Sequence, residues 1–157
     1  MTTEKPVQVY QIFIKAPPER VWQGLTLPEF TQRYFHGSAF ETDWRPGSTY
    51  RSMAGDVVMV EGRVLEYDPP RRLVYTWRAL WDPEVTKDKE SRVTCELEDA
   101  GGGMTRLTLV HDEFEGETET YKQTAGGWMW VLSNLETLLE TGDTLPAPSQ
   151  GAAASTR

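Results

Sequence analysis

The clearest pattern in the chain is a helical repeat of apolar residues near its C-terminus. Apolar side chains recur there at steps of three and four, which is the spacing of one face of an α-helix. The residues on this face are Tyr121, Ala125, Trp128, Leu132, Leu135 and Leu139. Glu117 and Glu119 suit a helix N-terminus, and Gly142 suits a C-terminal cap. The pattern predicts one long amphipathic helix over residues 118–140, with Trp128, Leu132 and Leu135 buried.

A glycine pair, Gly126 and Gly127, interrupts this helix. Each glycine costs about 1 kcal/mol relative to alanine in a helix interior. We therefore expect either that another part of the chain approaches the backbone closely at this point or that the helix bends there.

The N-terminal third predicts a strand followed by two short helices. Residues 7–14 are rich in β-branched and aromatic side chains, as strands are. Pro17 and Pro18 end this strand and begin a short helix. Thr26 and Glu29 have the spacing of a capping box, which predicts a second short helix directly afterwards.

From Ser38 onward the apolar residues alternate with polar ones, as in half-buried strands. Turn sequences at residues 45–48, 68–71 and 101–103 join these strands into hairpins, and residues 81–90 read as a longer surface loop. Leu73, Tyr75 and Trp77 share one face, which we predict to be the inside. An antiparallel meander needs one face covered, and the long helix is the candidate. The fold class is therefore α+β, with six or seven strands.

A second inward row follows from the same alternation in the last strand. Leu107, Leu109, His111 and Glu113 share a parity. The pattern predicts that two ionisable groups continue this apolar row toward the helix.

Composition and charge narrow the classes of partner. The 157 residues include 16 Lys and Arg against 24 Asp and Glu, for a net charge of −8. This charge disfavours nucleic acid and anionic membranes as partners. One cysteine and two histidines leave no disulfide and no convincing metal site, and we expect no cofactor. The absence of an apolar leader or span predicts no membrane insertion and a cytoplasmic location.

The domain organisation is simple, because this length suits one domain. Residues 1–6 are short and polar, and we expect them to be disordered. Residues 7–142 form the predicted domain. Residues 143–157 are rich in Pro, Ala, Ser and Gly without periodicity, which predicts a disordered tail.

Several of these segments, in this order, resemble a known family. The segments are 16–22 (APPERVW), 45–51 (RPGSTYR), 62–66 (GRVLE), 68–70 (DPP), 73–77 (LVYTW), 106–111 (RLTLVH) and 127–138, which begins with Gly-Trp. Together they resemble bacterial START-like proteins (SRPBCC superfamily) of the family named after the activator of the heat-shock chaperone ATPase. The resemblance spans residues 7–141.

The resemblance implies a helix-grip fold, in which a curved antiparallel sheet wraps a C-terminal helix and leaves a cavity between them. Relatives in the superfamily use that cavity for apolar molecules, and a minority catalyse cyclisation or dehydration in it. The eukaryotic activator also has a separate N-terminal domain, whereas only residues 1–6 precede the fold here. The resemblance therefore gives no expectation of chaperone activation.

A helix lying along the concave sheet would bring a set of mostly apolar side chains together. We expect this set to bind a small hydrophobic ligand. It comprises Tyr50, Tyr75, Trp77, Leu109, His111, Trp128 and Leu132.

Two alternatives to passive binding follow from other residues. His111 with a carboxylate such as Glu113 would suit proton transfer in a cyclase- or dehydratase-like enzyme, although no partner motif marks His111 as catalytic. Outward aromatic residues such as Trp81 and Trp130 would suit a protein-interaction module, either co-chaperone-like or a homodimer. Arg51 and Arg78 alternate with the aromatic face, which favours exposed arginines paired with nearby acids.

Overall fold

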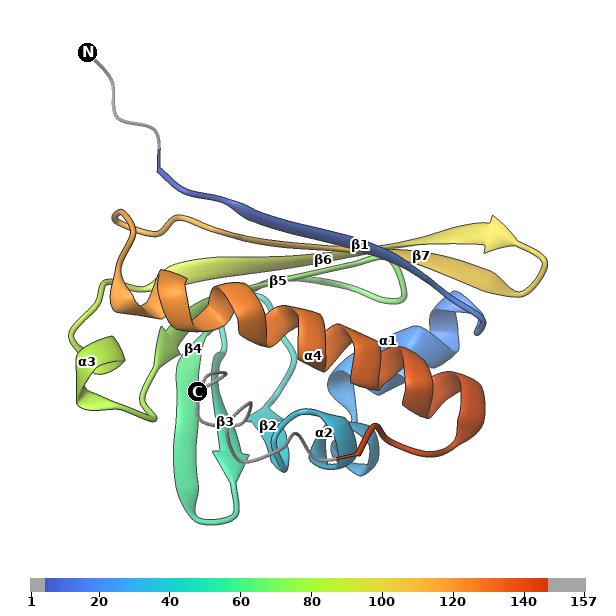
Figure 1. The fold of residues 1–157 in the computed structure, drawn as a ribbon, viewed down its shortest axis with the longest axis horizontal. Coiled ribbons are helices and arrows are strands. Elements are labelled where there is room, and N and C mark those ends of the chain that lie inside the picture. The colour runs from blue at the N-terminus through green and yellow to red at the C-terminus, as the bar shows by residue number, and fades with distance from the viewer. Residues whose placement is uncertain (1–4, 147–157) are drawn as a thin grey trace.

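In the computed structural model, which describes residues 5–146, a curved seven-stranded sheet packs against one long helix (Figure 1). The strand order across the sheet is β1-β7-β6-β5-β4-β3-β2, and every neighbouring pair is antiparallel. The strands are β1 (Gln8–Ile14), β2 (Ser38–Thr42), β3 (Thr49–Ala54), β4 (Val57–Asp68), β5 (Arg72–Ala79), β6 (Ser91–Gly101) and β7 (Met104–Asp112). The predicted α+β helix-grip fold is confirmed.

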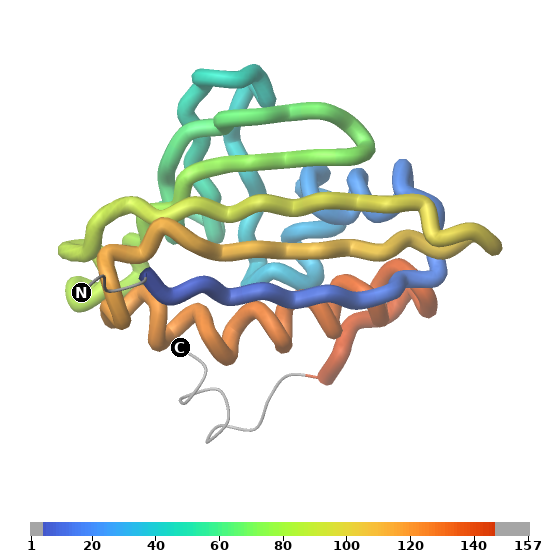
Figure 2. Tube along the Cα trace, turned by 90° about the horizontal axis from the view of Figure 1, so that it is seen from above, coloured from blue at the N-terminus to red at the C-terminus, as the bar shows by residue number. Residues whose placement is uncertain are grey.

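The long helix α4 (Glu119–Thr141) lies within one residue of its predicted bounds. The Thr118 hydroxyl accepts a hydrogen bond from the Tyr121 amide, and Gly142 caps the other end with a φ of 84°. Trp128, Leu132 and Leu135 are all buried, as their helical spacing predicted. Seen from above, α4 runs alongside β1, and the β3–β4 hairpin lies at the opposite side of the molecule (Figure 2).

Two short helices, α1 (Pro18–Thr26) and α2 (Pro28–Tyr34), follow β1 as predicted. The capping box predicted for α2 is wrong. Thr26 remains in the last turn of α1, where its hydroxyl donates to the Trp22 carbonyl, and Leu27 takes the N-cap position. Helix α1 packs closely on α4 at Gly24, where a Cβ atom would lie 2.9 Å from Leu135 Cδ1.

Two β-bulges bend the middle of the sheet. The register shifts between Ser52 and Met53 where β3 pairs with β4, and between Val64 and Glu66 where β4 pairs with β5. Both shifts place the extra residue in β4, and such bulges bend a strand and increase its twist. Strands β4, β3 and β2 consequently turn toward the α4 side of the sheet (Figure 1).

Gly62 lies in β4 between the two bulges and allows the bend. A Cβ atom at this position would lie 2.5 Å from Thr76 Oγ1 and 2.9 Å from the Thr76 carbonyl carbon. The Thr76 hydroxyl also accepts a hydrogen bond from the Arg63 amide, in place of a regular ladder bond. Only a residue without a side chain lets β4 and β5 approach this closely.

The predicted surface loop after β5 contains a one-turn helix, α3 (Pro83–Thr86). The described chain extends past the predicted domain boundary at residue 142. The Leu145 amide donates to Asn134 Oδ1, so residues 143–146 of the predicted tail include a hydrogen bond to α4. The rest of that tail, residues 147–157, lies outside the described residues, as do residues 1–4. Within residues 5–146, no helix is long and apolar enough to cross a membrane.

Replacing Gly62 with alanine tests the origin of the bend. Because the new methyl group would meet backbone atoms of Thr76, we expect Gly62→Ala to lower the free energy of unfolding by about 2–3 kcal/mol. Gly116→Ala is the matched control, since a Cβ atom there meets nothing within 4 Å. Equal stability of the two variants in urea denaturation would contradict this account.

Candidate functional site

An apolar cavity lies between the first half of α4 and the bent part of the sheet. Its volume is about 600 Å³, which is within the range of roughly 300–1,000 Å³ typical of small-molecule sites. Side chains from β2, β3, β4, β5, α4 and two loops line it. They are Phe35, His36, Ser38, Ser52, Val57, Met59, Val60, Trp77, Leu80, Trp81, Gln123, Thr124, Gly127, Trp128, Trp130 and Val131.

Aromatic rings form much of the cavity wall. The ring centroids of Trp77 and Trp128 are 5.3 Å apart, and Phe35 packs edge-on against Trp128 at 5.7 Å. Trp81 packs edge-on against Trp77 at 6.4 Å. The structure thus brings Trp77 from β5 and Trp128 from α4 together on one wall, as expected for these two residues.

Gly127 opens the cavity on the helix side. The close approach expected at the glycine pair is wrong, because Cβ atoms at Gly126 and Gly127 would meet nothing within 4 Å. Helix α4 continues through both residues. Gly127 lines the cavity whereas Gly126 does not, so a side chain at residue 127 would occupy space that now belongs to the cavity.

The polar side chains at one end of the cavity are already hydrogen-bonded within the protein. Trp81 Nε1 donates to Gln123 Oε1 at 2.8 Å, which fixes the orientation of the amide. Gln123 Nε2 donates to Asp82 and Glu119. None of the residues lining the cavity is Asp, Glu, Lys or Arg. Within residues 5–146, no group of three or more His, Cys, Asp or Glu side chains is arranged to hold a metal ion.

His111 lies behind the cavity wall in a chain of hydrogen bonds. Trp128 Nε1 donates to His111 Nδ1 at 3.0 Å, and His111 Nε2 lies 2.7 Å from Ser91 Oγ. An indole nitrogen can only donate, so Nδ1 is the acceptor and the imidazole proton is on Nε2. Nε2 therefore donates to Ser91, whose hydroxyl in turn donates to the Trp77 carbonyl at 3.3 Å. Burial lowers the pKa of His111 to about 3.

This chain leaves His111 without a free nitrogen for proton transfer. Nδ1 accepts from Trp128, Nε2 is already protonated, and His111 does not line the cavity. A histidine with its proton on Nε2 also cannot accept the Ser91 proton at that atom, so the two residues do not form a nucleophile and base.

Glu113 does not continue the inward row that alternation predicted. Strand β7 ends at Asp112, and Glu113 adopts a φ of 64°, which takes it out of the strand alternation. Its side chain is half exposed and lies 3.8 Å from the Arg92 guanidinium, whereas His111 is fully buried. The structure therefore does not bring Glu113 to the His111 imidazole.

Three other residues expected to bind ligand belong to a closely packed region. Tyr75, Leu109 and Leu132, together with Trp128, line a space of only about 10 Å³, which is no more than about one water molecule needs. They support the wall of the larger cavity from behind without lining it.

Tyr50 is buried away from the cavity. Its hydroxyl donates to the Thr76 carbonyl, and its ring packs edge-on against Tyr75. Burial raises the pKa of the Tyr50 hydroxyl well above its usual value. The two neighbouring arginines point outward and pair with acids, as alternation favoured: Arg51 with Glu41 and Arg78 with Glu61.

Several residues lining the cavity were not foreseen from the sequence. Phe35 lies in a loop and Met59 is the extra residue of a β4 bulge, and at both places periodicity gives no orientation. Gln123 is polar on an amphipathic helix, so its pattern indicates only a solvated face. Gly127 did carry a signal, because a helix-interior glycine demands an explanation.

A comparison with models of known protein families identifies the family of this chain. The family model described as "Activator of Hsp90 ATPase homolog 1-like protein" matches residues 15–140. The chain belongs to this family. No curated protein matches the chain.

Solved structures of similar fold include proteins from bacteria and from a parasite. A protein from Mesorhizobium loti is 27% identical, with a TM-score of 0.73 over 88% of this chain and 99% of its own. The Aha1 dimer from Colwellia psychrerythraea is 18% identical, with a TM-score of 0.70 over 87% and 98%. An Hsp90 activator from Plasmodium falciparum is 23% identical, with a TM-score of 0.67 over 85% and 96%.

The neutral state of His111 predicts a loss of stability in acid. The folded protein keeps His111 unprotonated down to pH of about 3, whereas the unfolded chain takes up this proton below about pH 6.5. The contribution of neutral His111 to the free energy of unfolding is therefore fully present above about pH 6.5 and is lost as the pH falls toward 3. The expected loss between pH 7.5 and pH 4 is about 3 kcal/mol.

His111→Gln isolates this contribution, because glutamine keeps a donor and an acceptor but does not titrate. Urea denaturation at both pH values should show a smaller acid loss in His111→Gln than in the wild type. The control variant His36→Gln, which changes the exposed histidine, should lose as much stability between pH 7.5 and pH 4 as the wild type does. An unchanged pH dependence in His111→Gln would contradict the assignment.

Proposed function

We propose that this protein binds a small hydrophobic molecule in the cavity between the sheet and α4, without catalysing a reaction. The observation that carries the proposal is the cavity of about 600 Å³ walled by Phe35, Trp77, Trp81, Trp128 and Trp130. Protein interiors are close-packed, so open space of this size beside large aromatic rings needs a reason. A bound apolar molecule would make the dispersion contacts that the empty wall lacks.

The helix sequence supports the same proposal. Gly127 gives up about 1 kcal/mol of helix propensity relative to alanine, and its Cα faces open space, not a packed neighbour. The benefit of glycine at this position is therefore the volume that it leaves to the cavity.

The enzyme alternative draws no support from this geometry. Both nitrogens of His111 are engaged, its pKa is far below neutral because of burial, and Glu113 faces Arg92. The cavity wall offers no carboxylate that could take a proton in its place.

A substitution at the glycine pair tests the binding function. We expect Gly127→Leu to weaken binding of the neutral apolar dye Nile red by tenfold or more, because the new side chain takes up cavity volume. Dye fluorescence during titration is the measurement. The magnitude corresponds to about 1.4 kcal/mol, roughly the burial of two methylene groups.

Gly126→Leu is the matched control. It makes the same change one residue earlier, where the side chain also meets open space but does not reach the cavity lining. Both variants should be more stable than the wild type, since leucine favours helix. Equal dye affinity of the two variants, or no dye binding by the wild type, would refute the proposed function.

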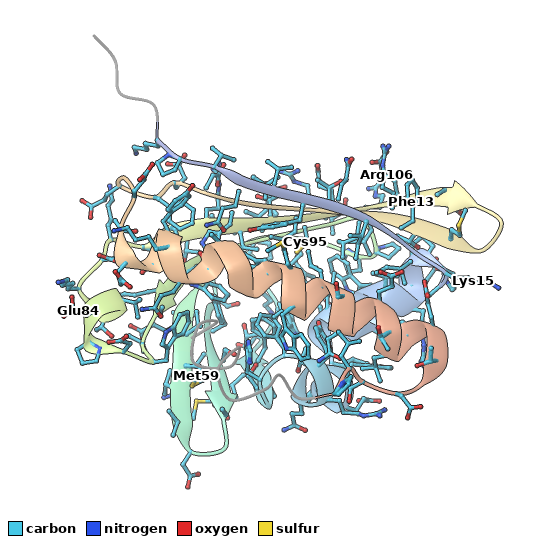
Figure 3. All side chains as sticks on the ribbon, viewed as in Figure 1. Phe13, Lys15, Met59, Glu84, Cys95 and Arg106 are labelled. Carbon is cyan, nitrogen blue, oxygen red and sulfur yellow. The ribbon has the colours of Figure 1, made fainter. Side chains whose placement is uncertain are left out.

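A second candidate function is self-association, and one surface favours it. Trp81 and Trp130, the aromatic residues expected to face outward, are half-buried and line the cavity instead. Exposed apolar residues lie on the edge strand β1, where Val9 is 61% and Phe13 56% exposed. Figure 3 shows Phe13 and Arg106 on the face of the sheet turned away from α4. A second copy of the chain is the occupant that we propose for this face, because a protein of the same fold, from Colwellia psychrerythraea, is described as a dimer.

This candidate predicts that the wild-type protein sediments as a dimer at micromolar concentration. Phe13→Glu should yield monomers, because it places a charge in the apolar contact. Met129→Glu, at an equally exposed apolar residue on α4, should leave the sedimentation coefficient unchanged. A monomeric wild type would exclude this candidate and leave the binding function untouched.

A further inference from the structure

The indole groups of the cavity wall differ in one respect. Trp81 Nε1 donates to Gln123, and Trp128 Nε1 donates to His111. Trp77 Nε1 is buried, and no atom of the described residues accepts its hydrogen bond. Trp77 as a whole is 95% buried, so the unpaired donor belongs to the interior and not to the surface.

The aromatic neighbours of Trp77 have no acceptor nitrogen to spare. The closest rings are Trp128, His111 and Trp81, at centroid distances of 5.3, 5.5 and 6.4 Å. The one acceptor nitrogen among them, His111 Nδ1, is taken by Trp128. The remaining ring faces accept hydrogen bonds only weakly.

An unpaired buried donor is costly, because folding has removed it from water without compensation. Trp77 lines the cavity with other atoms of its side chain, whereas Nε1 itself is covered, so a ligand in the cavity reaches this donor only if the indole rotates toward it. An acceptor atom on a molecule in that space would therefore pair the one indole nitrogen that the described residues bury without a partner. Because the described part of the protein does not supply this acceptor, the ligand has to supply it.

The same wall sets the charge of the ligand. The residues that line the cavity include no Asp, Glu, Lys or Arg, and His36 is the one ionisable side chain among them, so an ionised ligand would lose its hydration without meeting a carboxylate, ammonium or guanidinium group. The polar groups of Gln123 are occupied by Trp81, Asp82 and Glu119. A neutral molecule with a small polar feature fits this lining.

We propose that the ligand of this cavity is a neutral, largely apolar molecule with a carbonyl-type oxygen that accepts the hydrogen bond of Trp77 Nε1. This inference rests on the proposed binding function and adds the chemical class of the ligand. Trp77 is then the residue that orients the ligand, while the other rings supply apolar contact.

Two probes that differ in one group test the proposal: fluorenone, which carries a ketone, and fluorene, which has a methylene group in its place. Fluorenone should bind about fivefold more tightly, the value of one net hydrogen bond. In protein labelled with ¹⁵N at the indole nitrogens, fluorenone should shift the Trp77 Nε1–H resonance downfield. Fluorene should leave that resonance without a downfield shift. Single Trp→Phe variants assign the six indole signals.

Matched variants separate the donor from the ring. Trp77→Phe should abolish the preference for fluorenone, whereas Trp130→Phe, at another tryptophan of the wall, should retain it. Fluorenone-4-carboxylate, which is ionised at neutral pH, should bind at least tenfold more weakly than fluorenone. If Trp77→Phe does not fold, the indole shift in the wild-type protein still decides the question.

The outcomes distinguish this inference from the function on which it rests. Equal affinity for fluorenone and fluorene, without a shift of the Trp77 indole resonance, would show that the ligand needs no hydrogen-bond acceptor. Tight binding of fluorenone-4-carboxylate would show that the ligand need not be neutral. Either result would leave the binding function intact. Failure of Nile red and of both neutral probes to bind would refute the binding function itself.

Discussion

The apolar face of α4 is the constraint on which the rest of this structure depends. A helix of 23 residues is about 35 Å long, and its buried side chains need an equally long apolar surface opposite them. Strands β1, β7, β6 and β5 supply that surface. The remaining strands extend beyond the width of one helix, and the bulges in β4 turn them back toward it. The cavity lies where this turn meets the first half of α4.

Polar contacts inside this apolar interior hold the cavity wall in place. The chain from Trp128 through His111 and Ser91 to the Trp77 carbonyl connects α4 with three strands. Each donor in it has an acceptor, so the chain adds directional bonds to an otherwise non-directional contact. It fixes the Trp128 indole and the backbone of Trp77 beside the cavity, while the His111 imidazole stays behind them. The histidine therefore connects α4 to the sheet behind the cavity wall.

The family and the fold do not by themselves specify what this protein does. Structures with the same fold include one described as a dimer and one described as an Hsp90 activator. Function on a shared fold depends on local side chains. Here those features are an aromatic wall without Asp, Glu, Lys or Arg, a helix glycine beside open space, and one buried indole donor without an acceptor among the described residues.

The sequence by itself determined the elements and their inward faces, because periodicity reports which side of a helix or strand avoids water. It placed α4 and its C-terminal cap at Gly142, the hairpins, and the buried rows that contain Leu109 and Trp77. Tertiary structure decided what lies opposite each inward face. Trp77 meets open space and Leu109 meets packed core, although both have the same inward parity. Alternation also fails where the backbone leaves the regular strand, as at Glu113 and the β4 bulges, since these features depend on contacts between segments distant in the chain.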